Sequence, residues 1–262
     1  MCLRMSVGHR GHNLKADVIA LKVLLNSAWC FRNATPLKLT GRCDGALIAR
    51  IRFFQERFMH QEGEVTRRIE PRSTELYRLR RMLSSDFDED KLAAIMTSAT
   101  PASIARYFKH LVTEMALRSI NTPLRRAHFL AQLAHESLCF VYASELADGS
   151  AYEGRKDLGN SEKGDGKRFK GRGLIQLTGR TNYIAFGKAA GRDLTHDGNW
   201  TTVATDPVLA VGAAGWFWDT HKLNALADSD EIRKITKVIN GGTNGLDDRM
   251  RYYYRARYFL VE

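Results

Sequence analysis

Apolar residues recur at helical spacing in the middle of the chain, within residues 122–145, and predict a helix with one buried face. Thr122 is suited to the N-cap of this helix, and Pro123 is suited to its first position. The apolar positions are Leu130, Leu133, Ala134 and Leu138. Glu136 follows this run, so its carboxyl group should be partly desolvated, which favours the neutral form that a general acid needs.

A second carboxylate, Glu145, lies nine positions after Glu136. At roughly 100° per residue, a continuous helix would place the two side chains on opposite faces. If they act together, the helix must end between them and the chain must turn back. The pair Gly149-Ser150 indicates a break soon after Glu145. The structural alternative is an ordinary carboxylate at a helix end and a solvated one in a loop.

The front of the chain has the pattern of a small separate domain, residues 1–83. Three short helices are expected in it, at residues 17–26, 47–58 and 71–83. The polar and acidic run 84–90 is the expected linker.

The remainder, residues 91–262, is the expected second domain. It should begin with helices at 91–96 and 101–116. Residues 148–170 contain few aliphatic side chains, so they are either disordered or a functional loop over a cleft.

Composition narrows the class of protein. The 262 residues are 44% hydrophobic and 26% charged, and no apolar run approaches the roughly 20 residues that span a bilayer. The four cysteines form no C-x-x-C pair, and no zinc-protease motif is present, so neither a disulfide framework nor a metal site is expected.

The positive charge is concentrated at the front of the chain. Residues 1–83 contain 16 Lys and Arg against 7 Asp and Glu, whereas residues 84–262 contain 24 against 22. The front third should therefore approach a polyanion, either nucleic acid or an anionic cell envelope.

Three later stretches combine glycines with polar or aromatic residues. In residues 169–183, Gln176 and Thr178 alternate with apolar residues, as on a short strand with one polar face. Residues 211–219 join small residues to an aromatic block, which is typical of a close helix contact. Residues 235–249 predict an apolar helix that ends at Asn240, followed by two glycines.

The order of the front helices resembles the three-helix peptidoglycan-binding module of cell-wall hydrolases. The matching landmarks are Asp17-Val18, Leu21, Leu25, Asp44-Gly45, Phe54-Gln55 and Pro71 with Thr74. The resemblance implies binding to the bacterial cell wall.

The rest of the chain, from about residue 100, resembles glycoside hydrolase family 19, which contains chitinases and phage endolysins. The resemblance is carried by the ordered series His-Glu, a second Glu, Gly-Arg-Gly-Leu-Ile-Gln-Leu-Thr, Gly-Trp-Phe-Trp and Ile-Asn-Gly-Gly. The short interval between the two Glu residues is similar to the endolysin branch. Thr181 stands where chitinases often have a sugar-contacting Tyr, which favours a glycan other than chitin.

The family resemblance also implies a role for each matching residue. Glu136 would be the general acid, Glu145 the general base of an inverting mechanism, and Thr178 the residue that holds the attacking water. Such enzymes keep their two carboxyl groups roughly 6.5–9.5 Å apart. The implied substrate-binding residues are Gln176, Tyr183, Asn240 and Arg249.

Together these observations predict a mainly α-helical protein of two domains: a small three-helix wall-binding module and a lysozyme-like catalytic domain with a minor β element. We expect a monomeric muramidase-type endolysin that cuts β-1,4 bonds of peptidoglycan, with no cofactor, no nucleic-acid partner and no stable membrane insertion. The N-terminal residues lack the apolar core of a secretion signal, so the enzyme should stay in the host cytoplasm until release brings it to the periplasmic wall. The alternatives are a chitinase, a lytic transglycosylase that uses Glu136 alone, and a non-enzymatic envelope- or nucleic-acid-binding protein.

Overall fold

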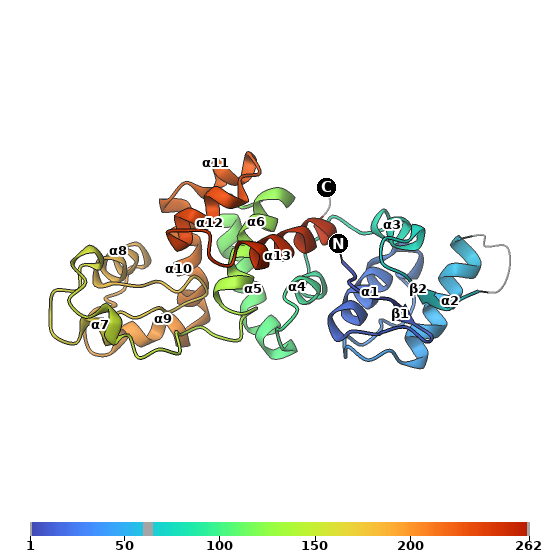
Figure 1. The fold of residues 1–262 in the computed structure, drawn as a ribbon, viewed down its shortest axis with the longest axis horizontal. Helices are drawn as coiled ribbons and strands as arrows, with labels where there is room; N and C mark the ends of the chain where they lie inside the picture. Colours follow the sequence, from blue (N-terminus) through green and yellow to red (C-terminus); the bar gives the residue numbers. More distant parts are fainter. Residues whose placement is uncertain (1, 60–64, 261–262) are drawn as a thin grey trace. The chain divides into compact units, whose positions relative to one another are not determined.

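The computed structural model describes residues 2–59 and 65–260, which form mostly helices (Figure 1). The chain divides into two compact units. The first unit contains the residues up to Thr97 together with those from Tyr254 onward, and the second runs from Ser98 to Tyr253. The expectation of a mainly helical fold is confirmed.

Within the described residues, the first unit combines four complete α-helices with a small β ladder. Strands β1 and β2 pair in antiparallel fashion, with Val7 opposite Ile69. The elements are β1 (Val7–Gly8), α1 (Lys15–Ser27), η1 (Trp29–Phe31), α2 (Gly45–Phe58), β2 (Arg68–Ile69), α3 (Thr74–Arg80) and α4 (Glu89–Ile95). The three helices expected near the front of the chain are therefore present as α1, α2 and α3.

A buried lysine joins α1 to the start of α2. The side chain of Asp44 caps α2 by accepting a hydrogen bond from the Leu47 N–H at 2.9 Å. Its other oxygen lies 2.6 Å from Lys22 Nζ, and Lys22 is completely buried. Lys22 also donates to the carbonyl of Lys38 at 3.0 Å. The ammonium group thus fixes the loop that precedes α2.

The boundary between the units differs from the linker expected at 84–90. Lys91 is buried, and its Nζ donates to the carbonyl oxygens of Ser84 and Asp86. Helix α4 packs against α1 within the first unit. The division between the units falls after Thr97. A polar, acidic composition therefore does not identify a linker by itself, since such a segment can also wrap around a buried cation.

The end of the chain also belongs to the first unit, rather than to a domain spanning 91–262. The guanidinium of Arg255 donates to the carbonyls of Cys2 at 2.6 Å and Ala16 at 2.9 Å. Tyr258 donates to the carbonyl of Leu76 at 2.7 Å. These long-range bonds carry no signal in the local sequence pattern.

The second unit is built around α5 (Pro101–Leu117), α6 (Pro123–Glu136) and α10 (Pro207–Thr220). Helix α10 packs closely on α5, because Gly215 leaves space for the side chain of Glu114. Trp218 of α10 is buried edge-on against Phe129 of α6, with ring centroids 5.3 Å apart. The interpretation of residues 211–219 as a close helix contact is confirmed.

Further elements complete the second unit. They are η2 (Ser150–Tyr152), η3 (Lys156–Leu158), α7 (Asp165–Arg168), α8 (Arg180–Ala190), η4 (Asn199–Thr201), α9 (Thr202–Thr205), α11 (Leu223–Asp228), α12 (Ile232–Asn240) and α13 (Leu246–Phe259), whose last turns lie in the first unit. Within the described residues, no helix has both the length and the apolar character needed to cross a bilayer.

The short strand expected around Gln176 is wrong. The segment forms a tight turn in which Gln176 has a φ of +55°, closed by an isolated bridge between Arg172 and Leu177. The only β ladder among residues 2–59 and 65–260 is the β1–β2 pair of the first unit. Alternating polar and apolar residues over five positions fit a turn as well as a strand.

Replacing Lys22 with Met should lower the free energy of unfolding by about 1–3 kcal/mol, because the buried hydrogen bonds of the ammonium group are lost. The hydrogen bond from Lys22 also holds the pKa of the Asp44 carboxyl below its ordinary value of 3.8. The stability that results from this lowered pKa is present above the unfolded-state pKa of Asp44 and is lost as the pH falls through the folded-state pKa.

Urea denaturation at neutral pH and near pH 3 measures both effects. Lys22→Met should lose less stability on acidification than the wild-type protein does. Equal acid sensitivity of the two proteins would contradict this account of Asp44.

Candidate active site

Helix α6 carries Glu136 at its last position. The Thr122 side chain caps this helix by accepting a hydrogen bond from the Arg125 N–H at 3.2 Å, and Pro123 occupies the first turn. Leu130 and Leu133 are fully buried, as expected for the apolar face. The predicted start of the helix is confirmed.

The helix ends at Glu136 in a left-handed turn. Leu138, Cys139 and Phe140 have φ values of 47°, 55° and 67°. This conformation costs roughly 1–2 kcal/mol per residue for an L-amino acid, so the surroundings must hold it. Leu138, which was expected on the buried face, is 46% exposed because it lies beyond the helix.

Buried hydrogen bonds hold the turn. Ser137 is completely buried, and its hydroxyl donates to the Leu133 carbonyl at 2.6 Å and accepts from the Phe140 N–H at 2.9 Å. The N–H of Tyr142 donates to the Ser137 carbonyl at 2.9 Å. The chain therefore turns back directly after Glu136, as joint action of Glu136 and Glu145 would require.

A buried guanidinium holds the carboxylate of Glu136. Nη2 of Arg249 donates to Glu136 Oε1, and Nη1 donates to Oε1 of Gln132, one turn earlier on α6. Arg249 and Gln132 are completely buried, whereas the Glu136 side chain keeps 15% of its surface exposed. The carboxylate of Glu136 is thus fixed by Arg249 on its buried side, and the rest of the side chain remains accessible to solvent.

The same end of α6 is tied to the start of α13. Nδ1 of His135 lies 2.8 Å from Asp248 Oδ2. Gly245 has a φ of +70°, and a Cβ at this position would lie 2.2 Å from His135 Cε1. Only glycine permits this approach of the backbone to the imidazole ring.

Glu145 is held by a different segment of the second unit. Its backbone N–H donates to the Gly171 carbonyl at 2.9 Å, and its Oε2 accepts from the Gly171 N–H at 3.2 Å. The Tyr152 hydroxyl donates to Oε1 at 3.0 Å. Burial, assisted by this bond, raises the pKa of Tyr152. The half-buried Glu145 is therefore anchored, unlike a solvated loop residue.

Gln176 lies beside Glu145, and Thr178 is bonded to the backbone of Gln176. A Cβ at Gly171 would lie 2.8 Å from Gln176 Oε1 and 3.3 Å from Glu145 Oε2, so the amide and the carboxylate converge over this glycine. The Thr178 hydroxyl donates to the Gln176 carbonyl at 2.8 Å, which leaves its oxygen able to accept another hydrogen bond. The structure therefore brings the side chains of Gln176 and Glu145 together, and Thr178 is tied to the backbone of Gln176.

Tyr183 lies beneath this group and has no exposed surface. Its hydroxyl donates to the Lys170 carbonyl at 2.9 Å and accepts from Arg172 Nη1 at 3.0 Å. Burial raises its pKa to about 12. A side chain without exposed surface has no contact with a glycan, so the expected substrate-binding role is corrected to support of the segment that holds Glu145.

The other two predicted binding residues differ from each other. Asn240 is exposed at the end of α12, where Gly241 adopts a φ of +75° as the sequence predicted. Arg249 is buried against Glu136, so we correct its expected role from substrate binding to positioning of the carboxylate.

Residues 148–170 form an ordered loop that contains η2, η3 and α7. Of the two alternatives that the sequence left open, disorder is therefore excluded. Asp165 is completely buried and accepts from Arg180 Nε at 2.8 Å. Glu153 accepts from the N–H groups of Gly164 and Gly166 at 2.6 and 2.9 Å. Tyr152 links this loop to Glu145.

Sequence reasoning missed Gln132, Ser137 and Tyr152. Gln132 stands four residues before Glu136, and a polar residue at this spacing on a buried face could have drawn attention. The roles of Ser137 and Tyr152 depend on how the backbone turns after α6, and no local pattern marks them. Within residues 2–59 and 65–260, no group of His, Cys, Asp or Glu side chains has the arrangement of a metal site.

Comparison with known proteins identifies the family of the chain. A family model described as chitinase class I matches residues 124–234. A family 19 glycosyl hydrolase domain-containing protein of Haemophilus influenzae is 40% identical over 184 residues, which cover 58% of this chain and 88% of that protein. The chain belongs to glycosyl hydrolase family 19. It is a glycosidase, and its substrates are glycans.

Other family 19 proteins are more distant. An acidic 27 kDa endochitinase of Solanum lycopersicum is 33% identical over 155 residues, and the alignment covers 49% of this chain and 60% of that protein. The crystal structure of chitinase C from Streptomyces griseus superimposes with a TM-score of 0.55 at 22% identity, covering 66% of this chain and 91% of that chain. This likeness shows the fold of the family 19 domain.

Glu136→Gln should lower glycosidase activity by about 10²–10⁴-fold, because the amide has no proton of suitable acidity to donate. Release of reducing ends from peptidoglycan and from chitin measures the loss. Glu231→Gln, at the start of α12 where the side chain pairs with Lys234, is the matched control and should keep full activity. Equal activities of the two variants would contradict the role of Glu136.

Arg249→Met should destabilise the protein by about 3 kcal/mol, since it leaves a half-buried carboxylate without its partner. In the double variant Arg249→Met/Glu136→Gln, most of this loss should be recovered, because no unpaired charge remains. Thermal and urea unfolding of the four proteins give the coupling energy. Additive losses would show that Arg249 does not act through Glu136.

Proposed function

We propose that this family 19 enzyme hydrolyses β-1,4 glycosidic bonds with inversion, using Glu136 as general acid and Glu145 as general base. The observation that carries the proposal is the separate anchoring of the two carboxylates. Glu136 is held by Arg249 at the end of α6, and Glu145 is held by Gly171 and Tyr152 on the following segment. An inverting reaction needs an acid and a base that are fixed independently on the two faces of the sugar.

In the proposed reaction, Glu136 donates a proton to the glycosidic oxygen as the bond to the anomeric carbon breaks. A water attacks that carbon from the opposite face and loses its proton to Glu145. The oxygen of Thr178 accepts a hydrogen bond from this water, and the Gln176 side chain contacts the sugar. Asn240, exposed at the end of α12, is a further substrate contact.

We propose peptidoglycan as the glycan and an endolysin as the biological type. The support is the basic front of the chain, 16 Lys and Arg against 7 Asp and Glu in residues 1–83, which suits an anionic wall polymer. In this proposal, the first unit binds the wall, and the second cuts the glycan after release of the monomeric enzyme from the cytoplasm of a phage-infected cell. Thr181, which packs against Gly159, stands where chitinases often have a sugar-contacting Tyr, and this supports a glycan other than chitin.

Chitin is the second candidate substrate. The relatives in Solanum lycopersicum and Streptomyces griseus carry the names endochitinase and chitinase. The anchored Glu145 supports hydrolysis over a transglycosylase reaction, in which Glu136 alone would leave an anhydro end.

Digestion of purified peptidoglycan and of chitin, followed by mass spectrometry of the new ends, tests the proposal. We expect soluble muropeptides with a hydrated reducing end at N-acetylmuramic acid, and none of these with Glu136→Gln. Anhydro ends would identify a transglycosylase. Release of sugar from chitin alone would identify a chitinase and overturn the peptidoglycan proposal.

A further inference from the structure

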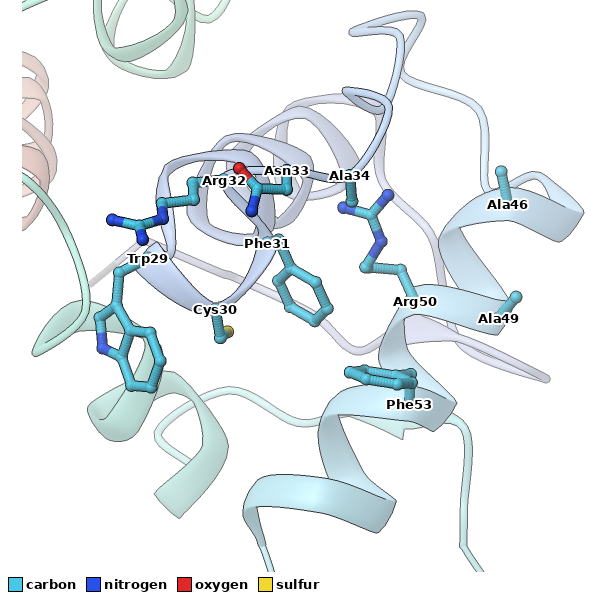
Figure 2. A pocket seen from close by; sticks show the side chains of 10 residues that line it. All are labelled: Trp29, Cys30, Phe31, Arg32, Asn33, Ala34, Ala46, Ala49, Arg50 and Phe53. Atoms are coloured by element: carbon cyan, nitrogen blue, oxygen red, sulfur yellow. The ribbon is translucent and has the colours of Figure 1, made fainter.

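The first unit contains two hollows that meet at the side chain of Trp29. The first, of about 880 Å³, lies between η1 and α2 and is lined by Phe31, Arg50 and Phe53 among others (Figure 2). The second, of about 490 Å³, is lined by Trp29, Tyr77, Arg78 and Arg81 among others. We call the two hollows together the Trp29 groove. Neither hollow has an acidic residue among its described lining residues.

Aromatic rings are exposed along this groove at three places. Trp29 is 61% exposed, Phe53 45% and Tyr77 64%. Trp29 packs edge-on against Phe58 with centroids 6.1 Å apart, and Phe53 lies 5.7 Å from Phe31, so the rings are held in place. Exposed and immobilised rings are typical of a binding surface, and the negative faces of such rings attract the C–H bonds of a sugar.

Arg50 supplies an unused hydrogen-bond donor in the first hollow. Its guanidinium lies 4.7 Å over the Phe31 ring, and Nη2 donates to the Thr35 carbonyl at 2.9 Å. Nη1 is buried and has no acceptor among the described residues. Burial also lowers the pKa of Arg50 from its ordinary value. A buried donor without an acceptor costs free energy, which a bound carboxylate would recover.

Further arginines extend the positive charge along the groove. Arg32 borders the first hollow, and Arg78 and Arg81 border the second. The guanidinium of Arg81 lies 5.9 Å from the ring centre of Tyr77, so charge and aromatic surface are paired in both hollows. Such repetition on the two sides of Trp29 suits a polymer with a repeated acidic group better than a small ligand.

We propose that the Trp29 groove binds a glycan strand whose sugars carry carboxylated peptide side chains, with rings stacked on Trp29 and a carboxylate bound to the guanidinium of Arg50. This inference rests on the proposed function, because it identifies the wall polymer as the ligand of the first unit. It adds a binding site that is separate from Glu136 and Glu145.

Binding by the full chain with Glu136→Gln, which should not cut its ligand, tests this inference. The probe is soluble glycan strands that retain their stem peptides, and calorimetry gives the affinity. Adding Arg50→Gln should weaken binding roughly tenfold, the value of one charge-assisted hydrogen bond. Adding Trp29→Ala should also weaken binding, because the ring on which the sugar stacks is lost. Arg52→Gln is the matched control, since Arg52 lies on the same helix and pairs with Glu56 outside the groove.

Two further probes, one neutral and one anionic, test the chemistry of the ligand. Chitohexaose binding should be unchanged by Arg50→Gln, because this glycan has no carboxylate. Polygalacturonate should bind more weakly than the peptide-bearing strands, since it lacks their side chains. Arg50→Lys should retain part of the affinity, and its thermal unfolding shows that the groove is folded.

The outcomes separate this inference from the proposed function. Equal affinities of Arg50→Gln, Trp29→Ala and Arg52→Gln would overturn the groove as a binding site, even if the enzyme cuts peptidoglycan. Equal binding of polygalacturonate would overturn the assigned ligand. Binding that depends on Arg50 in a protein that cuts only chitin would uphold the groove and overturn the proposed peptidoglycan hydrolysis.

Discussion

The reversal of the chain directly after Glu136 is the constraint on which the rest of the site depends. Three consecutive left-handed residues, 138–140, make this turn without a glycine, and the buried hydroxyl of Ser137 holds it from both sides. A continuing helix would carry Glu145 to the opposite face of α6. Because the helix stops, residues 143–145 can instead pair with the segment around Gly171.

The two carboxylates are held in place by different means. Glu136 has a buried guanidinium on one side, itself shared with Gln132, so its position is set by rigid helices α6 and α13. Glu145 has a tyrosine hydroxyl and a backbone N–H, both neutral donors from the loop and turn region. The two carboxylates are therefore anchored by separate parts of the second unit.

Three features of this region could be predicted from the sequence: the start of α6, its apolar face and the need for a break before Glu145. The location of that break could not be predicted, because Leu-Cys-Phe has no glycine and the turn is imposed by tertiary hydrogen bonds. Tyr183 and Arg249 were matched to binding positions by motif alone. Their burial follows from packing between segments distant in the chain, which one sequence does not display. The division after Thr97 could not be predicted for a similar reason, since Lys91 and Arg255 act through contacts with backbone carbonyls.

The central claim is that a water activated at Glu145 attacks the sugar on the face opposite to Glu136. Proton NMR of the products within the first minutes of digestion, before the anomers equilibrate, tests it most directly. The account predicts that the new reducing ends appear first as the α-anomer from a β-linked glycan. Initial formation of the β-anomer, or of a 1,6-anhydro sugar, would contradict it.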